Sequence, residues 1–320
     1  MNSKTLIIFF VKFLLLTILF LVVYFAAAFI FSPPASKIIE VEPGPISVTA
    51  GLLLVGATNT LVVMLALQQS RWNGWHLTLA TIVSYYGAVT VMPHLETAFT
   101  LTNLTVSPPI LRSLFLMGLP PALLFVPLAV WILGKFKRRK PDKKPNERLI
   151  MPAGQWVWKL VLLVFVYLIL YLGAGYFFGW KNPALRAFYG GTDPGNFILQ
   201  VRHILQTNPW LVPFQGMRAL LWVAFVLPII RMTRGRFWQV ALLVAVLMSV
   251  PQNISQLLPT PFIPSNSVRI SLMIETGFSS FLFGLIVTWL LYRKHNSLAD
   301  LFKLLDEPSI KPSRPGKRSR

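Results

Sequence analysis

Eight long apolar stretches constrain this sequence more than any other feature. Each has about 18 residues or more with few charges, the length of helix that crosses a hydrocarbon core about 30 Å thick. Because a helix satisfies its own backbone hydrogen bonds inside a bilayer, the sequence predicts an all-α integral membrane protein with about eight transmembrane helices. The expected spans are Leu6–Phe31, Ile46–Leu67, Trp75–Met92, Pro109–Leu133, Val157–Phe178, Leu211–Ile230, Phe237–Leu258 and Val268–Tyr292.

The composition agrees with this class and excludes others. Hydrophobic residues make up 55% of the 320 residues and charged residues 12%, whereas soluble domains are about 25% charged. This balance excludes an ordinary soluble globule, and it excludes a disordered chain as well. The chain has no cysteine, which excludes disulfides, thiolate metal sites and cysteine nucleophiles.

The basic residues predict the orientation of the spans. Of 30 Lys and Arg, 23 fall on the side that holds both termini and seven on the other side. Cytoplasmic loops collect Lys and Arg, so both termini are expected in the cytoplasm of a multi-pass protein of the cell membrane, specifically a bacterial cytoplasmic membrane. The basic loop at 135–148 and the basic tail are expected to contact anionic lipid headgroups. No aromatic platform accompanies this charge, so we expect no nucleic-acid partner.

The chain reads as two tandem four-helix repeats. Residues 24–31 (YFAAAFIF) and 171–178 (YLGAGYFF) both close an outward-running span, and the Glu-Thr-Ala-Phe segment at Glu96 weakly matches Glu-Thr-Gly-Phe at Glu275. Chance likeness between apolar segments is the alternative. Four spans per half give both halves the same orientation, a parallel repeat. The expected organisation is a first membrane repeat at 1–134, a basic cytoplasmic loop at 135–154, a second membrane repeat at 155–294, and a cytoplasmic amphipathic segment with a basic disordered tail at 295–320.

Ionisable residues inside spans are expensive to bury and are therefore the first functional candidates. At 1.5 Å per residue, Arg218 lies about 12 Å inside the outer end of its span and Glu275 about 10 Å inside its own. Their matched depths and opposite signs predict that they approach one another or share one polar pocket. Gln215, one turn outward of Arg218, and Asn59, in the second span, add polar groups to this prediction. A structural ion pair and interhelical hydrogen bonding are the alternatives.

A second set of candidates falls at the expected outer face. Glu96, His94, His203 and Asp193 are possible acid–base groups there. Only His94-x-Glu96 has a ligand-like spacing, which is too weak to predict a metal. The sequence lacks HExxH, GxSxG and Walker motifs, so no catalytic residue is identified and neither a cofactor nor a metal is expected.

Three functions remain open at this point. The repeat and the polar residues at matched depth favour a small-solute or lipid transporter, or a permease component, with a polar pocket opening outward. One alternative is a non-catalytic membrane assembly subunit with a membrane protein partner. The other is a membrane enzyme that acts on a lipid-linked substrate at the outer face.

Overall fold

The computed structural model describes residues 3–32, 40–102, 104–137, 146, 148–193, 195–295 and 298–301. This part of the chain is helical without strands, and seven of its helices are long and apolar enough to cross a membrane. The chain is therefore an all-α, multi-pass membrane protein, which confirms this part of the predicted fold class. The helices are α1 (Ser3–Phe31), α2 (Val48–Gln68), α3 (Gly74–Tyr86), η1 (Gly87–Val91), α4 (Met92–Thr100), α5 (Pro108–Met117), η2 (Pro121–Phe125), α6 (Val126–Ile132), α7 (Ala153–Ala174), η3 (Gly175–Gly179), α8 (Pro183–Tyr189), α9 (Phe197–Thr207), α10 (Leu211–Met232), α11 (Phe237–Asn253), η4 (Ile254–Leu257), α12 (Asn266–Leu291) and α13 (Leu298–Leu301).

Seven predicted spans correspond to the seven long apolar helices within a few residues. The predicted span Trp75–Met92 lies in α3–η1–α4, which is helical from Gly74 to Thr100 but is not among the seven. Polar side chains within the predicted span, including His76 and Ser84, lower its mean hydropathy. Residues 138–145 and 147 of the predicted basic loop, and the predicted tail from residue 302 onward, lie outside the described residues.

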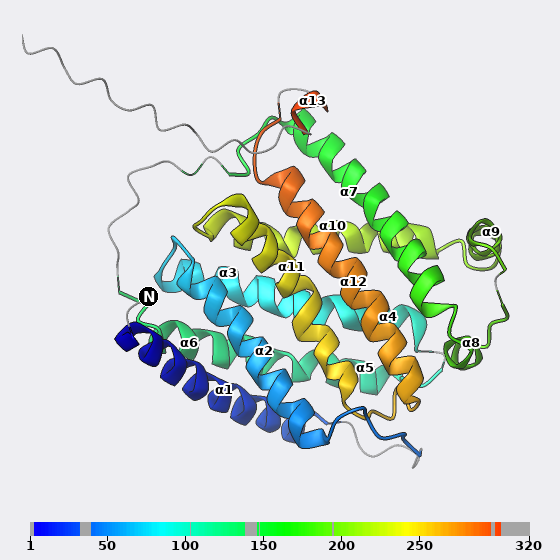
Figure 1. Cartoon of the computed structure of the whole chain (residues 1–320), viewed down its shortest axis with the longest axis horizontal. Coiled ribbons are helices and arrows are strands. Elements are labelled where there is room, and N and C mark those ends of the chain that lie inside the picture. The colour runs from blue at the N-terminus through cyan, green and yellow to red at the C-terminus, as the bar shows by residue number, and fades with distance from the viewer. Residues whose placement is uncertain are drawn as a thin grey trace, which may run out of the picture.

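The long helices form two crossing layers (Figure 1). In one layer, α1, α2, α11, α12 and α7 contact one another in that order. Behind it, α3–η1–α4 lies between α10 and α5–η2–α6. The layers close on each other at both edges, because α7 contacts α10 and α1 contacts α5 and η2. As a result, α3–η1–α4, from early in the chain, packs against α10 from the later part.

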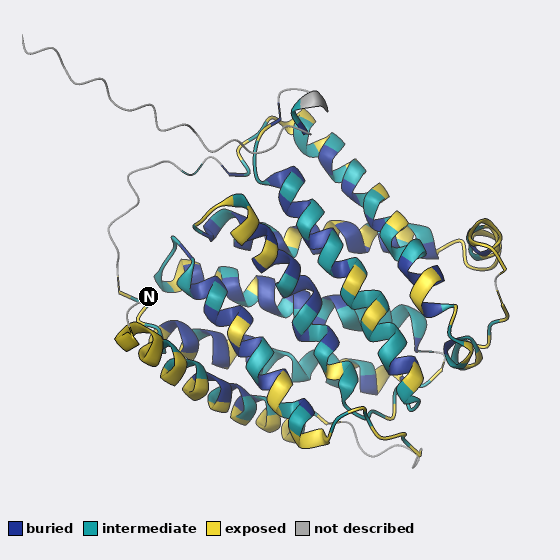
Figure 2. Ribbon diagram, viewed as in Figure 1, coloured by how far each residue is buried: buried dark blue, intermediate teal, exposed yellow. Residues whose placement is uncertain are grey.

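Burial follows this arrangement (Figure 2). The core lies where the layers cross, and it contains large buried side chains such as Trp222, Phe125 and Phe283. The outer faces of α1 and α7 are apolar and exposed, with Ile18 and Val161 as examples. Apolar side chains on the outside of a bundle are stable against lipid tails rather than water, so these faces are the ones that contact the bilayer.

Three long helices contain a wider π turn. The turn η1 is followed by Pro93, and η2 begins at Pro121. Proline lacks an N–H and its ring clashes with the carbonyl four residues earlier, so a local widening relieves the clash. The third turn, η3, runs from Gly175 to Gly179 and ends α7. Such turns re-aim the side chains next to them and occur frequently at functional sites.

The two ends of the bundle differ in chemistry. One end, which we call the basic end, carries Lys135, Arg148, Arg231 and Arg234. There Ser70, after α2, forms an antiparallel bridge with Thr233, after α10. The opposite end, which we call the α8 end, carries α8, α9 and the segments at 101–107 and 258–265. Because each long helix runs from one end to the other, the loops alternate between the ends.

Candidate functional site

The buried charge of α10, Arg218, forms an ion pair with Glu96 of α4, and their side chains are 8% and 23% exposed. Gln215 binds both partners. Its Nε2 donates to the two Glu96 carboxylate oxygens at 3.1 and 3.3 Å, and its Oε1 accepts from Arg218 Nη1 at 2.7 Å. Arg218 Nη2 also donates to the Met92 carbonyl at 3.2 Å. An amide and a carbonyl therefore replace part of the hydration that these charges lose on burial.

Two tyrosines of α7 complete the environment of this pair. The Tyr171 hydroxyl donates to Glu96 Oε1 at 3.0 Å. Tyr167, one turn deeper, interacts with the side chains of Arg218 and Trp222. Glu96 thus accepts hydrogen bonds from α7 and α10 together, and this connection ties α4 to both helices.

Glu275 of α12 belongs to the same cluster without contacting Arg218. Its carboxylate oxygens lie against Gly175 and Gly179 of η3, and a Cβ atom at Gly179 would collide with one of them. Tyr171 interacts electrostatically with Glu275, Glu96 and Arg218, which places all four groups in one polar region. Within the described residues Glu275 forms no ion pair. The carboxylate that neutralises Arg218 is therefore Glu96, and the shared polar region is what links Arg218 to Glu275.

The segment after α7 folds back over the cluster at the α8 end. Tyr189 of α8 interacts through its side chain with Thr100 of α4 and electrostatically with Glu275 and Glu96. Burial raises the pKa of the Tyr189 phenol above its ordinary value, and the two carboxylates raise it further. The phenol therefore stays neutral and keeps its proton for hydrogen bonding. The rings of Phe99 and Phe214, stacked with centroids 4.2 Å apart, close the seam between α4 and α10.

The structure places Asn59 elsewhere. Its Oδ1 accepts a hydrogen bond from the Tyr85 hydroxyl at 2.6 Å, and its Nδ2 donates to the Val55 carbonyl at 2.8 Å. Tyr24 of α1 interacts electrostatically with Tyr85. Asn59 therefore joins α2 to α3 in a neutral network that is separate from the Arg218 cluster.

The remaining outer-face candidates are dispersed. His94 packs edge-on against Phe115 of α5, with ring centroids 5.6 Å apart. His203 is exposed on α9, and Asp193 pairs with Arg186 at 3.2 Å. In the part of the chain that the structure describes, no three His, Asp or Glu side chains gather as potential metal ligands.

Sequence reasoning did not identify Tyr167, Tyr171, Gly175, Gly179 and Tyr189 as parts of the site. The spacing of these residues was a usable signal. Four of them, Tyr167, Tyr171, Gly175 and Gly179, follow one another at intervals of four residues and so share one helix face. A polar and small-residue stripe on an otherwise apolar span indicates the face that packs against protein.

No protein-family model, curated protein or solved structure matches this chain. The geometry of the cluster is therefore the basis of the functional conclusion.

Proposed function

We propose that this chain is a transporter, or the membrane component of a permease, that binds a small solute or lipid beside Glu96, Arg218 and Glu275. The observation that carries the proposal is Glu275, a carboxylate inside a span that has no cationic partner in the described structure, next to a second carboxylate that has one. A purely structural ion pair needs only Glu96 and Arg218. An additional carboxylate is costly at this depth, which supports a role in binding or coupling.

The arrangement of helices supports the same proposal. The cluster draws on α4, α7, α10 and α12, and it lies about a third of the way along α10 from the α8 end. Substrate sites of transporters lie within the membrane where structural repeats meet, and they use interrupted helices. The π turn η1 ends at Val91, five residues before Glu96, and the π turn η3 lies against Glu275.

We extend the proposal to eight spans with both termini in the cytoplasm. The segment α3–η1–α4 begins at the basic end, where the Gly74 N–H donates to the Lys135 carbonyl at 2.9 Å. It ends at the α8 end, where Leu101 packs with Leu185 and Ile263. This supports an eighth crossing, and the excess of Lys and Arg at the basic end supports a cytoplasmic location for that end.

A tandem repeat with boundaries 1–134 and 155–294, joined by the loop at 135–154, is part of the same proposal. The backbone bridge at Ser70 and Thr233 joins the ends of α2 and α10, which are the second spans of the two proposed repeats. Its two hydrogen bonds, Arg71 N–H to Met232 O and Arg234 N–H to Gln69 O, are reciprocal, as expected about a twofold axis along the membrane normal. The matched residues are Lys12 and Lys159, Leu16 and Leu163, and Tyr24 and Tyr171, all 147 apart; Ser70 and Thr233, Arg71 and Arg234, and Trp75 and Trp238, all 163 apart; and Phe125 and Phe283, and Trp131 and Trp289, both 158 apart.

Single-cysteine labelling tests the transport pathway, and the absence of native cysteine makes it direct. The variants Gln215→Cys and Thr100→Cys place thiols within the cluster and on its α8 side. They are exposed to a charged, membrane-impermeant methanethiosulfonate in sealed right-side-out and inside-out vesicles. The matched control is Leu54→Cys, a lipid-facing position of α2 that we expect to stay unlabelled.

Labelling of the cluster positions from both faces is the expected result, because a transporter exposes its site to each side in turn. Labelling from the α8 side alone would contradict transport and would fit an enzyme or a receptor at that face. Labelling from neither side, with full reaction after denaturation, would identify a structural cluster and would likewise contradict the proposal.

A further inference from the structure

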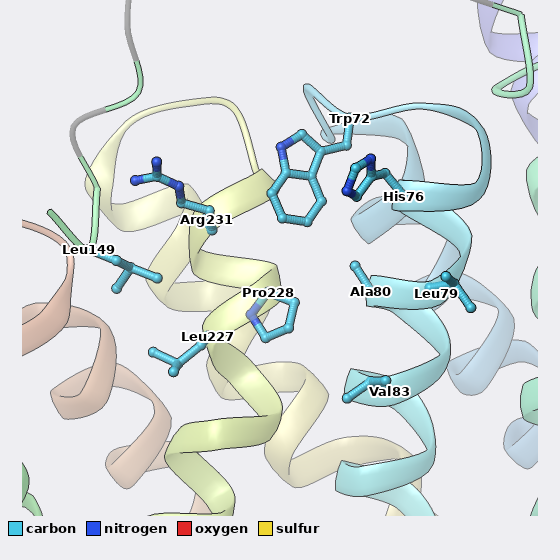
Figure 3. A pocket seen from close by; sticks show the side chains of 9 residues that line it. All are labelled: Trp72, His76, Leu79, Ala80, Val83, Leu149, Leu227, Pro228 and Arg231. Atoms are coloured by element: carbon cyan, nitrogen blue, oxygen red, sulfur yellow. The ribbon is translucent and has the colours of Figure 1, made fainter.

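A groove at the basic end runs between α3 and α10 (Figure 3). Its volume is about 410 Å³, which is in the range of ligand pockets. Its walls are almost entirely apolar: Ala80 and Val83 of α3 face Leu227 and Pro228 of α10 across it. The groove lies far along α10 from the Glu96–Arg218 cluster, so it is a separate site.

The groove opens toward the bilayer rather than toward the core. Leu79 and Val83 on its α3 wall are 58% and 49% exposed, and Trp75 nearby is 65% exposed. Apolar side chains with this exposure on the outside of a membrane bundle face acyl chains. A chain-like apolar ligand can therefore enter the groove sideways from the membrane.

The end of the groove nearest the basic loops carries polar groups. Figure 3 shows Trp72 and His76 side by side on the α3 side, with ring centroids 5.9 Å apart, and Arg231 on the α10 side. An indole N–H, an imidazole and a guanidinium are the donors that recognise phosphate at a membrane interface. Arg231 uses Nη1 to bind the Arg148 carbonyl, which fixes the guanidinium beside the groove.

Charge complementarity favours an anion at this end. Arg71, Arg148 and Arg231 gather here, and in the described part of the chain none of them pairs with a carboxylate. Arg148 instead binds the carbonyls of Ile230, Thr233 and Gly235. The Arg71 Nε is buried and has no acceptor in the described structure. A phosphate bound here would therefore lie beside excess positive charge at the end of the apolar groove.

We propose that this groove is a specific site for an anionic phospholipid, with one acyl chain between α3 and α10 and the phosphate at Arg231, Trp72 and His76. The inference is independent of the proposed transport function, because it concerns a different surface and neither proposal requires the other.

Native mass spectrometry of the full chain in detergent tests the proposal. Dioleoylphosphatidylglycerol and dioleoylphosphatidylcholine are titrated separately, and inorganic phosphate is added as a competitor. We expect the anionic lipid to bind about tenfold more tightly than the zwitterionic one. Both lipids offer a phosphate for charge-assisted hydrogen bonds, but only the anionic headgroup carries a net negative charge that the arginines attract. Val83→Trp, which fills the groove, and Arg231→Gln should each remove this preference.

Two variants serve as matched controls. Val161→Trp adds the same ring to an exposed position of α7, and Arg112→Gln removes an exposed arginine of α5 at the α8 end. Both should keep the preference of the unmodified chain. Should Arg231→Gln fail to fold, Val83→Trp and Trp72→Phe carry the test.

Three outcomes would overturn the proposal. Equal retention of the two lipids would show that the headgroup is not recognised. A preference that survives Val83→Trp would place the lipid outside the groove. Complete competition by millimolar inorganic phosphate would identify the ligand as a free anion and not a lipid.

Discussion

Two buried clusters in this bundle contain a tyrosine from a long outer helix, and they differ in charge. In the neutral cluster, Tyr24 accompanies the Tyr85–Asn59 hydrogen bond, and the Asn59 amide is satisfied by the carbonyl of its own helix. In the charged cluster, Tyr171 binds Glu96, and Glu275 lies close by with no cationic partner among the described residues. A neutral network whose polar groups are all hydrogen-bonded is explained by helix packing alone. A buried carboxylate without a cationic partner is not explained by helix packing, and a role in the proposed binding site would explain it.

The proposed repeat makes this comparison sharper. In the proposed alignment Tyr24 matches Tyr171, whereas Leu52, Val55 and Met117 match Gln215, Arg218 and Glu275. Glu275 then corresponds to Met117 and not to Glu96, so the weak likeness between the segments at Glu96 and Glu275 is not part of this alignment. The charged cluster also takes Glu96 from the first proposed repeat, so a duplicated scaffold of this kind would hold one charged site rather than two. The following predictions test whether the two clusters differ as this comparison requires.

The largest effect is expected for Arg218→Met. It leaves Glu96 buried without its cation, and breaking a buried pair in this way destabilises by about 3–5 kcal/mol. Unfolding of the detergent-purified chain, followed by circular dichroism, measures the change. Adding Glu96→Gln to the same chain should restore most of the lost stability, and a variant as stable as the parent would show that the pair is hydrated.

Gly179→Ala should have the next largest effect. Its Cβ would collide with the Glu275 carboxylate, and because this end of a flexible side chain can shift, the cost lies at the lower end of overpacking, about 1–2 kcal/mol. Gly173→Ala is the matched control on the same helix, because a Cβ there meets no atom within 4 Å. If the two variants unfold at the same temperature, Glu275 does not lie against η3.

Tyr85→Phe should have a smaller effect, about 0.5–1.5 kcal/mol, because it removes one neutral hydrogen bond to Asn59. The same unfolding assay measures it. Combined with Gln215→Cys, this variant should leave thiol labelling unchanged from both faces. Altered labelling would connect the neutral cluster to the pathway and would remove the distinction between the two clusters.

Glu275→Gln should destabilise the fold least, because no ion pair among the described residues is lost and the cost of burying a charge is removed. Its effect should appear instead in the labelling of Gln215→Cys, whose distribution between the two faces we expect to shift. A loss of several kcal/mol, comparable with Arg218→Met, would reveal a cationic partner for Glu275 and would make the charged cluster purely structural.

The sequence could predict Arg218 and Glu275 as important because charge inside an apolar run is visible without any structure. It could not predict which carboxylate neutralises Arg218. Depth along a span follows from counting residues, whereas the direction in which a side chain points across the bundle depends on the packing of neighbouring helices. Glu96 was expected at the outer face because the helix was expected to end near Met92. In the structure α4 continues to Thr100, which carries Glu96 to Arg218.

The sequence by itself determined that this chain is a helical, multi-pass membrane protein, because long apolar runs have few other stable states and a helix satisfies its own hydrogen bonds. The tertiary structure decided the order of helices in the two layers, the Glu96–Arg218 pair, the space that Gly175 and Gly179 leave for Glu275, and the groove between α3 and α10. These features arise from contacts between segments far apart in the chain. Lipid and protein neighbours are similarly apolar, so local hydrophobicity does not encode which helix face meets which partner.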